Sequence, residues 1–276
     1  MSTGLRFALL GPIRAWRGAE EVKLGSPQQK LALALLLLRE GRPVSVDEIV
    51  DAVWGAAPPR GARGTVRTYV NRLRRLLSPA DDGLITSVRG GYAMSVEAGA
   101  VDWSRFRTRV AAARQARARG ALRAASDQLR SAHDLWQGTA LSELRGDFAD
   151  EQRTRLEEAR AAALEERLEI DLALGKHASA SAELAEAVAA NPTRERLREL
   201  LMTALVASGR QAEARAVYDE GRRLLVARRG AGLPRVATDG PGPPTADAGR
   251  ARRRERPAGL PTTCQHSLYC WIHAEV

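Results

Sequence analysis

Residues 65–77 read TVRTYVNRLRRLL, and this stretch decides the fold of the first third of the chain. Its apolar residues recur at the spacing that buries one stripe of an α-helix. They are Val66, Val70, Leu73 and Leu77. The residues that project from the other side of such a helix are Thr68, Asn71, Arg72 and Arg75. Arginine, asparagine and threonine supply the donors that read base edges or grip phosphates, so the pattern favours a helix that enters a DNA groove.

A short hairpin pattern follows this helix. Residues 85–88 (ITSV) alternate as a strand does, Arg89, Gly90 and Gly91 supply a turn, and residues 92–94 (YAM) return. An arginine-rich helix by itself is more often a solvated surface. A hairpin beside it changes that interpretation, because the pair resembles a DNA-binding helix with its wing. The tip of the wing would place Arg89 at the minor groove or the DNA backbone.

Two further helices are predicted before the arginine-rich one. The first covers residues 27–40 and follows Ser26, which has the side chain of a helix N-cap. The second covers residues 45–54 and opens with Ser45 and Glu48 at the spacing of a capping box. Three helices and a hairpin, with the third helix basic, predict a winged helix-turn-helix.

These residues resemble a known family. The resemblance is carried by residues 5–10 and 13–16, Val53-Trp54-Gly55, residues 70–74 (VNRLR) and residues 88–92 (VRGGY). Together they look like the OmpR-like winged-helix DNA-binding domain, and the region after residue 101 looks like the bacterial transcriptional activator domain. That order, over about residues 5–227, is similar to the Streptomyces antibiotic regulatory protein family.

The resemblance implies a sequence-specific transcriptional activator of an antibiotic or other secondary-metabolite gene cluster. Such a protein would bind direct repeats in double-stranded promoter DNA as a homodimer and help to recruit RNA polymerase and its sigma factor. The loop of residues 55–61 resembles the family's polymerase-contact loop. Two alternatives stay open, namely a helical adaptor and an effector-sensing regulator, both with weakened DNA binding.

Eight residues form the expected DNA contacts. Those expected in the major groove are Thr68, Asn71 and Arg72, and those expected on phosphates are Arg67, Arg74 and Arg75. Arg89 would reach the backbone or minor groove from the wing. The family's helix phase also brings Tyr69 near the DNA, although the apolar stripe places Tyr69 at the margin of the core.

The net charge of +10 is unevenly distributed along the 276 residues. Residues 1–100 hold 14 Lys and Arg against 9 Asp and Glu, whereas residues 101–227 hold 21 against 20. Residues 228–276 hold 8 against 4. The predicted DNA-binding part therefore carries the positive excess that attraction to phosphates requires, and the nearly neutral middle part is better suited to packing and protein contacts.

The predicted fold class is mainly α with a small β component. A winged helix-turn-helix domain, residues 1–99, is followed by an all-α domain, residues 100–227, whose helices resemble tetratricopeptide units. The sequence Gly175-x2-Ala178-x3-Ala182 returns 34 residues later as Gly209-x2-Ala212-x3-Ala216. Small side chains at this period let paired helices approach closely, although a plain helical bundle is the alternative. The aromatic residues expected to pack rather than bind a ligand are Trp103, Phe106, Trp136 and Phe148.

Residues 228–276 are expected to form a disordered tail, because glycine, proline and arginine crowd the segment and apolar periodicity ends. The change of character at residue 228 would also fit a shift of reading frame. Within the tail, Cys264, His266, Cys270 and His273 have the residue types of a zinc site. Their spacing is unfamiliar and their flanks lack regular structure, so no metal site is expected.

Several functional classes are disfavoured by the sequence. No catalytic constellation stands out, so neither an enzyme activity nor a cofactor is expected. The longest apolar run, residues 31–38, is too short to cross a bilayer, and the N-terminus lacks the apolar run of a secretory signal. Cys264 and Cys270 are the only cysteines. We therefore expect a cytoplasmic protein without membrane contact.

Overall fold

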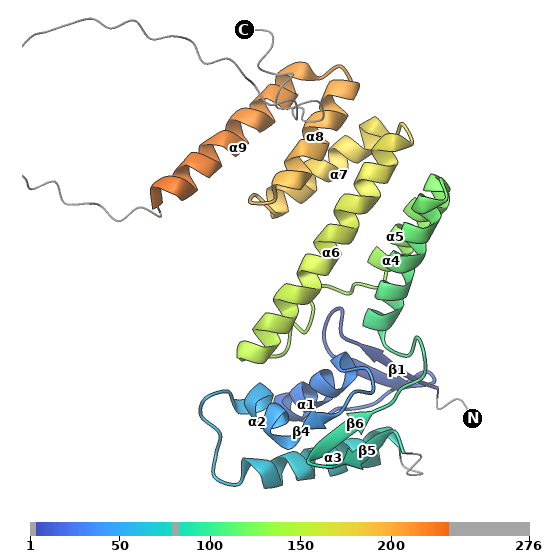
Figure 1. Cartoon of the computed structure of the whole chain (residues 1–276), viewed down its shortest axis with the longest axis vertical. Helices are drawn as coiled ribbons and strands as arrows, with labels where there is room; N and C mark the ends of the chain where they lie inside the picture. Colours follow the sequence, from blue (N-terminus) through green and yellow to red (C-terminus); the bar gives the residue numbers. More distant parts are fainter. Residues whose placement is uncertain (1–3, 79–82, 232–276) are drawn as a thin grey trace, which may run out of the picture. The chain divides into compact units, whose positions relative to one another are not determined.

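The structure, a computed structural model, describes residues 4–78 and 83–231. They divide into two compact units, with the division after Ala180 (Figure 1). The first unit therefore contains the winged helix and the helical region up to residue 180, and its core is continuous from Leu5 to Ile170. None of the described helices is long and apolar enough to span a membrane.

A small antiparallel sheet opens the chain. Its strands, in spatial order, are β1 (Leu5–Ala8), β2 (Arg14–Arg17) and β3 (Glu20–Glu21). Phe7 pairs with Ala15, and both side chains are buried. β1 and β2 coincide closely with residues 5–10 and 13–16, which carry the resemblance to the OmpR-like domain, whereas the two adjacent glutamates of β3 give no strand signal.

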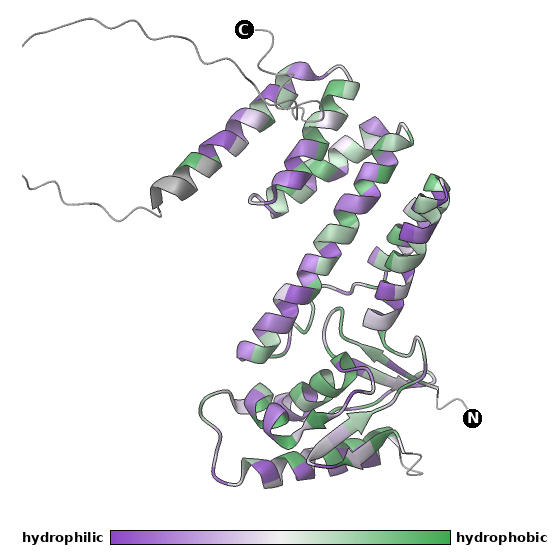
Figure 2. Cartoon of the chain, in the orientation of Figure 1, coloured by the Kyte–Doolittle hydropathy of each residue, from purple (hydrophilic) through white to green (hydrophobic). Residues whose placement is uncertain are grey.

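The first two helices begin where the capping residues predict. In α1 (Pro27–Leu38) the Ser26 hydroxyl accepts a hydrogen bond from the Gln29 amide. In α2 (Val46–Trp54) Ser45 and Glu48 form the predicted reciprocal capping box. α1 is hydrophobic over most of its length because it is buried on nearly every side (Figure 2).

The third helix and the wing complete the winged helix-turn-helix. α3 (Ala62–Leu77) begins three residues earlier than the predicted stretch, and the wing strands are β5 (Ile85–Val88) and β6 (Gly91–Met94). β6 lies between β5 and the short strand β4 (Val44–Ser45). A Cβ at Gly91 would lie 1.9 Å from the Val44 carbonyl oxygen. Gly91 is therefore part of β6 and lets it approach β4, and the turn consists of Arg89 and Gly90.

A buried carboxylate joins the winged helix to the next helix. Asp102 opens α4 (Asp102–Ala118) and is 7% exposed. Its two oxygens accept hydrogen bonds from the backbone amides of Leu9, at 2.9 and 3.0 Å, and of Leu10, at 3.0 Å. The Trp103 amide donates a further bond at 2.7 Å. Burial raises the pKa of Asp102 above its ordinary value, against the lowering effect of these backbone hydrogen bonds.

The turn between β1 and β2 also contacts the loop before the long helix α6 (Asp147–Ala173). The Gln137 amide donates to the Leu10 carbonyl at 2.7 Å, and the Leu141 amide donates to Leu9 at 3.2 Å. Arg153 of α6 donates to the Leu141 and Leu144 carbonyls and so holds the same loop from the other side. The winged helix and the start of the helical region thus share one hydrogen-bonded junction.

Helices α4 and α5 (Leu122–His133) form a hairpin that packs against α6. Asp171, buried near the end of α6, accepts hydrogen bonds from Ser126 at 2.8 Å and Lys176 at 2.7 Å and pairs with Arg167. Burial alone would raise the pKa of Asp171, but these partners hold it below its ordinary value. The carboxylate therefore links α5, α6 and the turn that follows α6.

Aromatic packing in this region is as the sequence predicts. The rings of Trp103 and Phe106 stack with centroids 5.5 Å apart, and the Trp136 ring meets Phe106 edge-on at 5.7 Å. Phe148 is partly buried against the same core. These side chains are packing residues at the base of the helical region.

The remaining helices are α7 (His177–Ala190), α8 (Glu195–Ala207) and α9 (Gln211–Ala231). Gly175 and Gly209 both have φ near +77°, namely +78° and +76°, and each ends one helix before the next begins. The repeat of turn glycines is confirmed. The expectation that the alanines of this repeat let paired helices approach closely is wrong, because Ala178, Ala182, Ala212 and Ala216 are exposed.

The buried alanines lie at a different position of the repeat. Ala180 and Ala214 are 2% and 3% exposed, and each follows its turn glycine by five residues. Ala125 follows Gly120 by the same interval and is fully buried. The helix phase, which the glycine spacing alone does not fix, explains the difference. Helix α9 continues to Ala231, and the zinc-like residues Cys264, His266, Cys270 and His273 lie outside the described residues.

Candidate nucleic-acid interface

The rotation of α3 about its axis is set by its buried face. That face consists of Ala62, Val66, Val70, Leu73 and Leu77. Val66, Val70 and Leu73 are fully buried, so turning the helix would expose its largest apolar side chains and is strongly unfavourable. Figure 2 shows α3 alternating between hydrophilic and hydrophobic turns. The predicted apolar stripe is confirmed, and it determines which residues face outward.

The outward face of α3 carries most of the predicted contact residues. Arg67, Thr68, Asn71, Arg72 and Arg75 are all exposed. The side chains of the three arginines form no hydrogen bond or ion pair with any residue that the structure describes. The helix α3 itself contains no acidic residue. The Thr68 hydroxyl donates to the Gly64 carbonyl at 3.2 Å, which leaves its oxygen as an acceptor. This face is a cationic surface with donors available to a ligand.

Tyr69 lies at the edge of the outward face. It is partly buried, and its ring stacks on Trp54 at the end of α2, with centroids 6.2 Å apart and an angle of 20° between the rings. This packing agrees with the expectation that Tyr69 lies at the margin of the core, and its contact with DNA stays a prediction. Trp54 itself is only partly buried, so the pair borders the loop of residues 55–61.

Arg74 occupies a different position from its neighbours. Its Nε donates to the Ile85 carbonyl at 2.9 Å and its Nη2 donates to the Ser87 hydroxyl at 2.9 Å. Its guanidinium also lies over the Tyr92 ring, 5.8 Å from the centroid. The side chain therefore joins α3 to both strands of the wing, a role that the helical pattern did not reveal.

The wing presents Arg89 at its tip. Arg89 is exposed and forms no hydrogen bond or ion pair within the described part of the chain. Gly90 beside it has a φ of +78°, which a side chain would strain. The wing is attached to the start of α2, because the Val46 amide donates a hydrogen bond to the Gly90 carbonyl at 2.9 Å. The hairpin thus projects one arginine from a fixed base.

Two positioning arginines were missed by sequence reasoning. Arg17 on β2 donates to the Leu76 carbonyl, at the end of α3, at 2.7 Å. Arg63 near the start of α3 pairs with Asp47 of α2 at 2.8 Å. A cation at the carbonyl end of a helix is favourable because of the helix dipole. No sequence signal links Arg17 to Leu76, since they are 59 residues apart.

The geometry suits recognition of a polyanion. Arginines on one helix face and at the tip of a neighbouring hairpin present planar donors that match phosphate oxygens and base edges. The loop of residues 56–61, which precedes α3, is exposed as well. Among the described residues, no group of three or more histidines, cysteines or carboxylates is placed to hold a metal ion.

Comparison with protein families identifies both parts of the chain. Residues 19–94 match the model described as "Transcriptional regulatory protein, C terminal". Residues 101–233 match the model described as "Bacterial transcriptional activator domain". The first match covers α3 and the wing, and the second begins one residue before α4.

Individual relatives agree with these matches. The regulatory protein AfsR of Streptomyces coelicolor is 52% identical over 81% of the chain, but the chain spans only 22% of that protein's length. The regulatory protein DnrI of Streptomyces peucetius is 34% identical over 80% of the chain and is covered over 85% of its own length.

A solved structure of Mycobacterium tuberculosis EmbR, in complex with a low affinity phosphopeptide, superposes with a TM-score of 0.78. The two proteins are 33% identical, and the match covers 82% of this chain and 61% of that one. The order of the two domain models and the near full-length match to DnrI lead to one conclusion: the chain belongs to the Streptomyces antibiotic regulatory protein family.

Proposed function

We propose that the chain is a transcriptional activator that binds a specific DNA duplex through α3 and the wing. The single observation that carries the proposal is the outward face of α3. There, Arg67, Arg72 and Arg75 are exposed and have no partner among the described residues, while the opposite face is locked in the core. Exposed cations on a fixed helix are what phosphate and base contacts require.

The contact residues have distinct proposed roles. Those assigned to base edges are Thr68, Asn71 and Arg72, those assigned to phosphates are Arg67 and Arg75, and Arg89 is assigned to the minor groove or backbone beside the wing. Tyr69 borders the DNA with its outer ring face. Arg74 is assigned to holding the wing against α3, because two of its donors already bond to β5.

The wider function is proposed from the family and from the junction at Asp102. Residues 1–99 form the DNA-binding domain and residues 100–227 the activator domain, which would contact a second copy on direct repeats and RNA polymerase with its sigma factor. Support comes from the exposed loop of residues 56–61 and from the hydrogen bonds that fix α4 to the winged helix. The target genes would be those of a secondary-metabolite cluster.

The proposal is tested by removing one base contact. Full-length chain would first be used to select a binding sequence from a random duplex library. We expect Arg72→Ala to weaken binding to that sequence by about 1–3 kcal/mol, as the loss of a bidentate base contact does. The measurement is a gel shift at several salt concentrations, and the logarithm of the affinity should fall steeply with the logarithm of salt concentration.

Arg123→Ala is the matched control, since Arg123 is an exposed arginine on α5 without a partner among the described residues. It should leave the affinity unchanged. If Arg72→Ala binds the selected sequence as tightly as the unchanged chain and gives the same footprint, the assignment of Arg72 is wrong. A flat salt response would contradict DNA binding by this face altogether.

A further inference from the structure

One glycine on the outward face of α3 has no explanation within the described residues. Gly64 lies in the first turn of this helix, where glycine is less favourable than alanine because it loses more backbone freedom on folding. Proteins accept this cost where the backbone is left-handed or where another group approaches closely. Gly64 is not among the glycines with a positive φ, and a Cβ added there would meet no neighbouring side chain or other described element within 4 Å.

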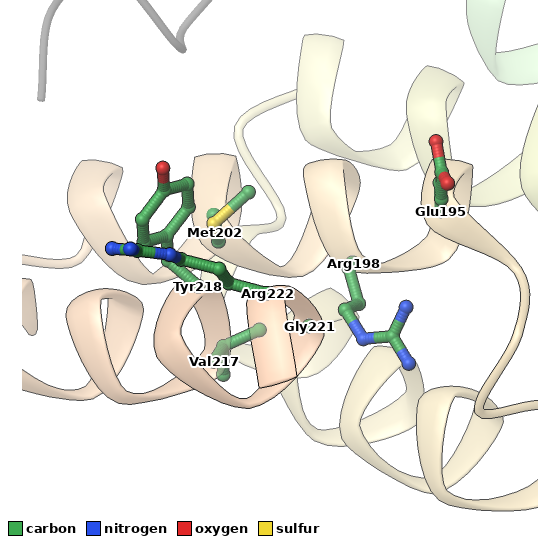
Figure 3. A pocket seen from close by; sticks show the side chains of 7 residues that line it. All are labelled: Glu195, Arg198, Met202, Val217, Tyr218, Gly221 and Arg222. Atoms are coloured by element: carbon green, nitrogen blue, oxygen red, sulfur yellow. The ribbon is translucent and has the colours of Figure 1, made fainter. Parts of the chain in front are cut away.

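Gly221, inside α9, shows a glycine that packing does explain. A Cβ there would lie 3.0 Å from Cδ of Arg198, which belongs to the neighbouring helix α8 (Figure 3). The glycine therefore leaves room for an arginine stem within the protein. The space beside Gly64 is open instead, so a close approach there can come only from a molecule outside the described residues.

Gly64 lies on the same face of α3 as the proposed DNA contacts. It is exposed, and Arg67, Thr68 and Asn71 follow it by three, four and seven residues. This spacing places residues on one side of a helix. Gly64 therefore belongs to the surface that meets the duplex in the proposed function, one turn closer to the start of the helix.

The threonines around Gly64 also keep their hydroxyls close to the helix backbone. The Thr65 hydroxyl donates to the Gly61 carbonyl at 3.4 Å, and the Thr68 hydroxyl donates to the Gly64 carbonyl at 3.2 Å. Such bonds turn a threonine side chain back onto the preceding turn. With no side chain at Gly61 or Gly64, this part of α3 presents a strip of nearly bare backbone.

We propose that the duplex lies against this strip, so close to α3 at Gly64 that no side chain fits between them. The inference rests on the proposed function and deepens it, because it makes Gly64 the residue that sets how far α3 enters the major groove. The start of a recognition helix is the part that contacts base edges in helix-turn-helix proteins. The depth of α3 then determines whether Asn71 and Arg72 reach the bases, since a direct hydrogen bond holds only within a narrow range of distances.

Gly64→Ala in the full-length chain tests the inference, because the added methyl group should have opposite effects on folding and on binding. In open space the methyl group favours the helix, so the midpoint of urea unfolding should rise. Against the duplex it collides, so the affinity for the sequence selected with the unchanged chain should fall about tenfold or more, as it does when a base contact is lost. Gel shifts at fixed salt concentration measure this affinity.

A second duplex and a larger side chain sharpen the test. The ratio of the affinities for the selected duplex and an unrelated duplex of equal length should fall in Gly64→Ala, because flexible arginines still reach phosphates when base contacts are misplaced. Gly64→Leu should weaken binding to the selected duplex further, since leucine is also a good helix former but is larger. Ala124→Leu is the matched control at an exposed position of α5, and it should leave the affinity unchanged.

Two results would overturn the inference. The first is that Gly64→Ala binds the selected duplex as tightly as the unchanged chain does. The second is a lower urea midpoint for Gly64→Ala, which would give the glycine a role within the fold. Both results leave the proposed DNA binding in place, because the duplex is one that the unchanged chain selects. If the unchanged chain selects no duplex, the proposed function fails, and this inference fails with it.

Discussion

Arg74 and Arg75 are adjacent in the chain and have different environments. Arg75 is exposed on the outward face of α3, whereas Arg74 is partly buried and bonded to Ile85 and Ser87 of the wing. Successive side chains of a helix differ in direction by about 100°. Here this rotation places Arg75 on the exposed face that we propose for DNA, and Arg74 at the contact between α3 and the hairpin. Chemical identity alone therefore does not assign a role to an arginine on this helix.

This difference predicts that two neighbouring substitutions change stability by different amounts. Arg74→Ala should lower the free energy of unfolding by about 1–2 kcal/mol, because two hydrogen bonds and a contact with the Tyr92 ring are lost. Arg75→Ala should change it by no more than about 0.5 kcal/mol, as at most exposed positions. Urea unfolding followed by tryptophan fluorescence measures both. Equal stability of the two variants would show that the bonds from Arg74 do not stabilise the wing.

At the scale of elements, the wing depends on close approach of three strands. β6 is the central strand, and Gly91 faces the backbone of β4 without room for a side chain. The same strand pairs with β5, which Arg74 holds against α3. The position of the wing tip is thus determined by backbone contacts at its base.

Substitution of two glycines tests this arrangement. Gly91→Ala should lower the free energy of unfolding by about 2–3 kcal/mol, since the added Cβ would collide with the Val44 carbonyl and force the strands apart. Gly64→Ala is the matched control in α3, where a Cβ meets nothing within 4 Å. It should raise the free energy of unfolding by about 0.5–1 kcal/mol, because alanine favours the helix. Urea unfolding curves of the two variants and of the unchanged chain give both changes in the free energy of unfolding.

At the scale of the whole first unit, the junction at Asp102 couples the DNA-binding fold to the helical region. Three backbone amides, those of Leu9, Leu10 and Trp103, donate to this one carboxylate. The loop that ends before α6 is bonded to the same β1–β2 turn. A displacement of α4 would therefore break hydrogen bonds of the winged helix, so we expect the two sides of this junction to open together.

Asp102→Ala should loosen both sides of this junction together. The amides of Leu9 and Leu10 would lose their buried acceptor, and hydrogen exchange there should accelerate about tenfold or more. Exchange in the loop of residues 137–144 should rise as well, while α8, in the second unit, serves as the unaffected control. Faster exchange at Leu9 and Leu10 alone, with an unchanged loop, would mean that the junction is not cooperative.

The amino-acid sequence alone determined the features that arise from neighbouring residues. The capping residues Ser26 and Ser45 set where α1 and α2 begin, the valine and leucine spacing set the buried face of α3, and Gly175 and Gly209 set the helix turns. Each of these signals acts within a few residues, so it can be recognised before the fold is known.

Only the tertiary structure decided which polar side chains have a partner within the protein. Arg74 donates hydrogen bonds to the wing, and Arg17 donates one to the end of α3. Asp102 accepts hydrogen bonds from the β1–β2 turn, whose residues are 92 and 93 positions away in the chain. Arg198 is buried because α9 packs over α8 at Gly221. These partners are far apart in the chain, and no local periodicity encodes a contact that arises only when separate elements pack together.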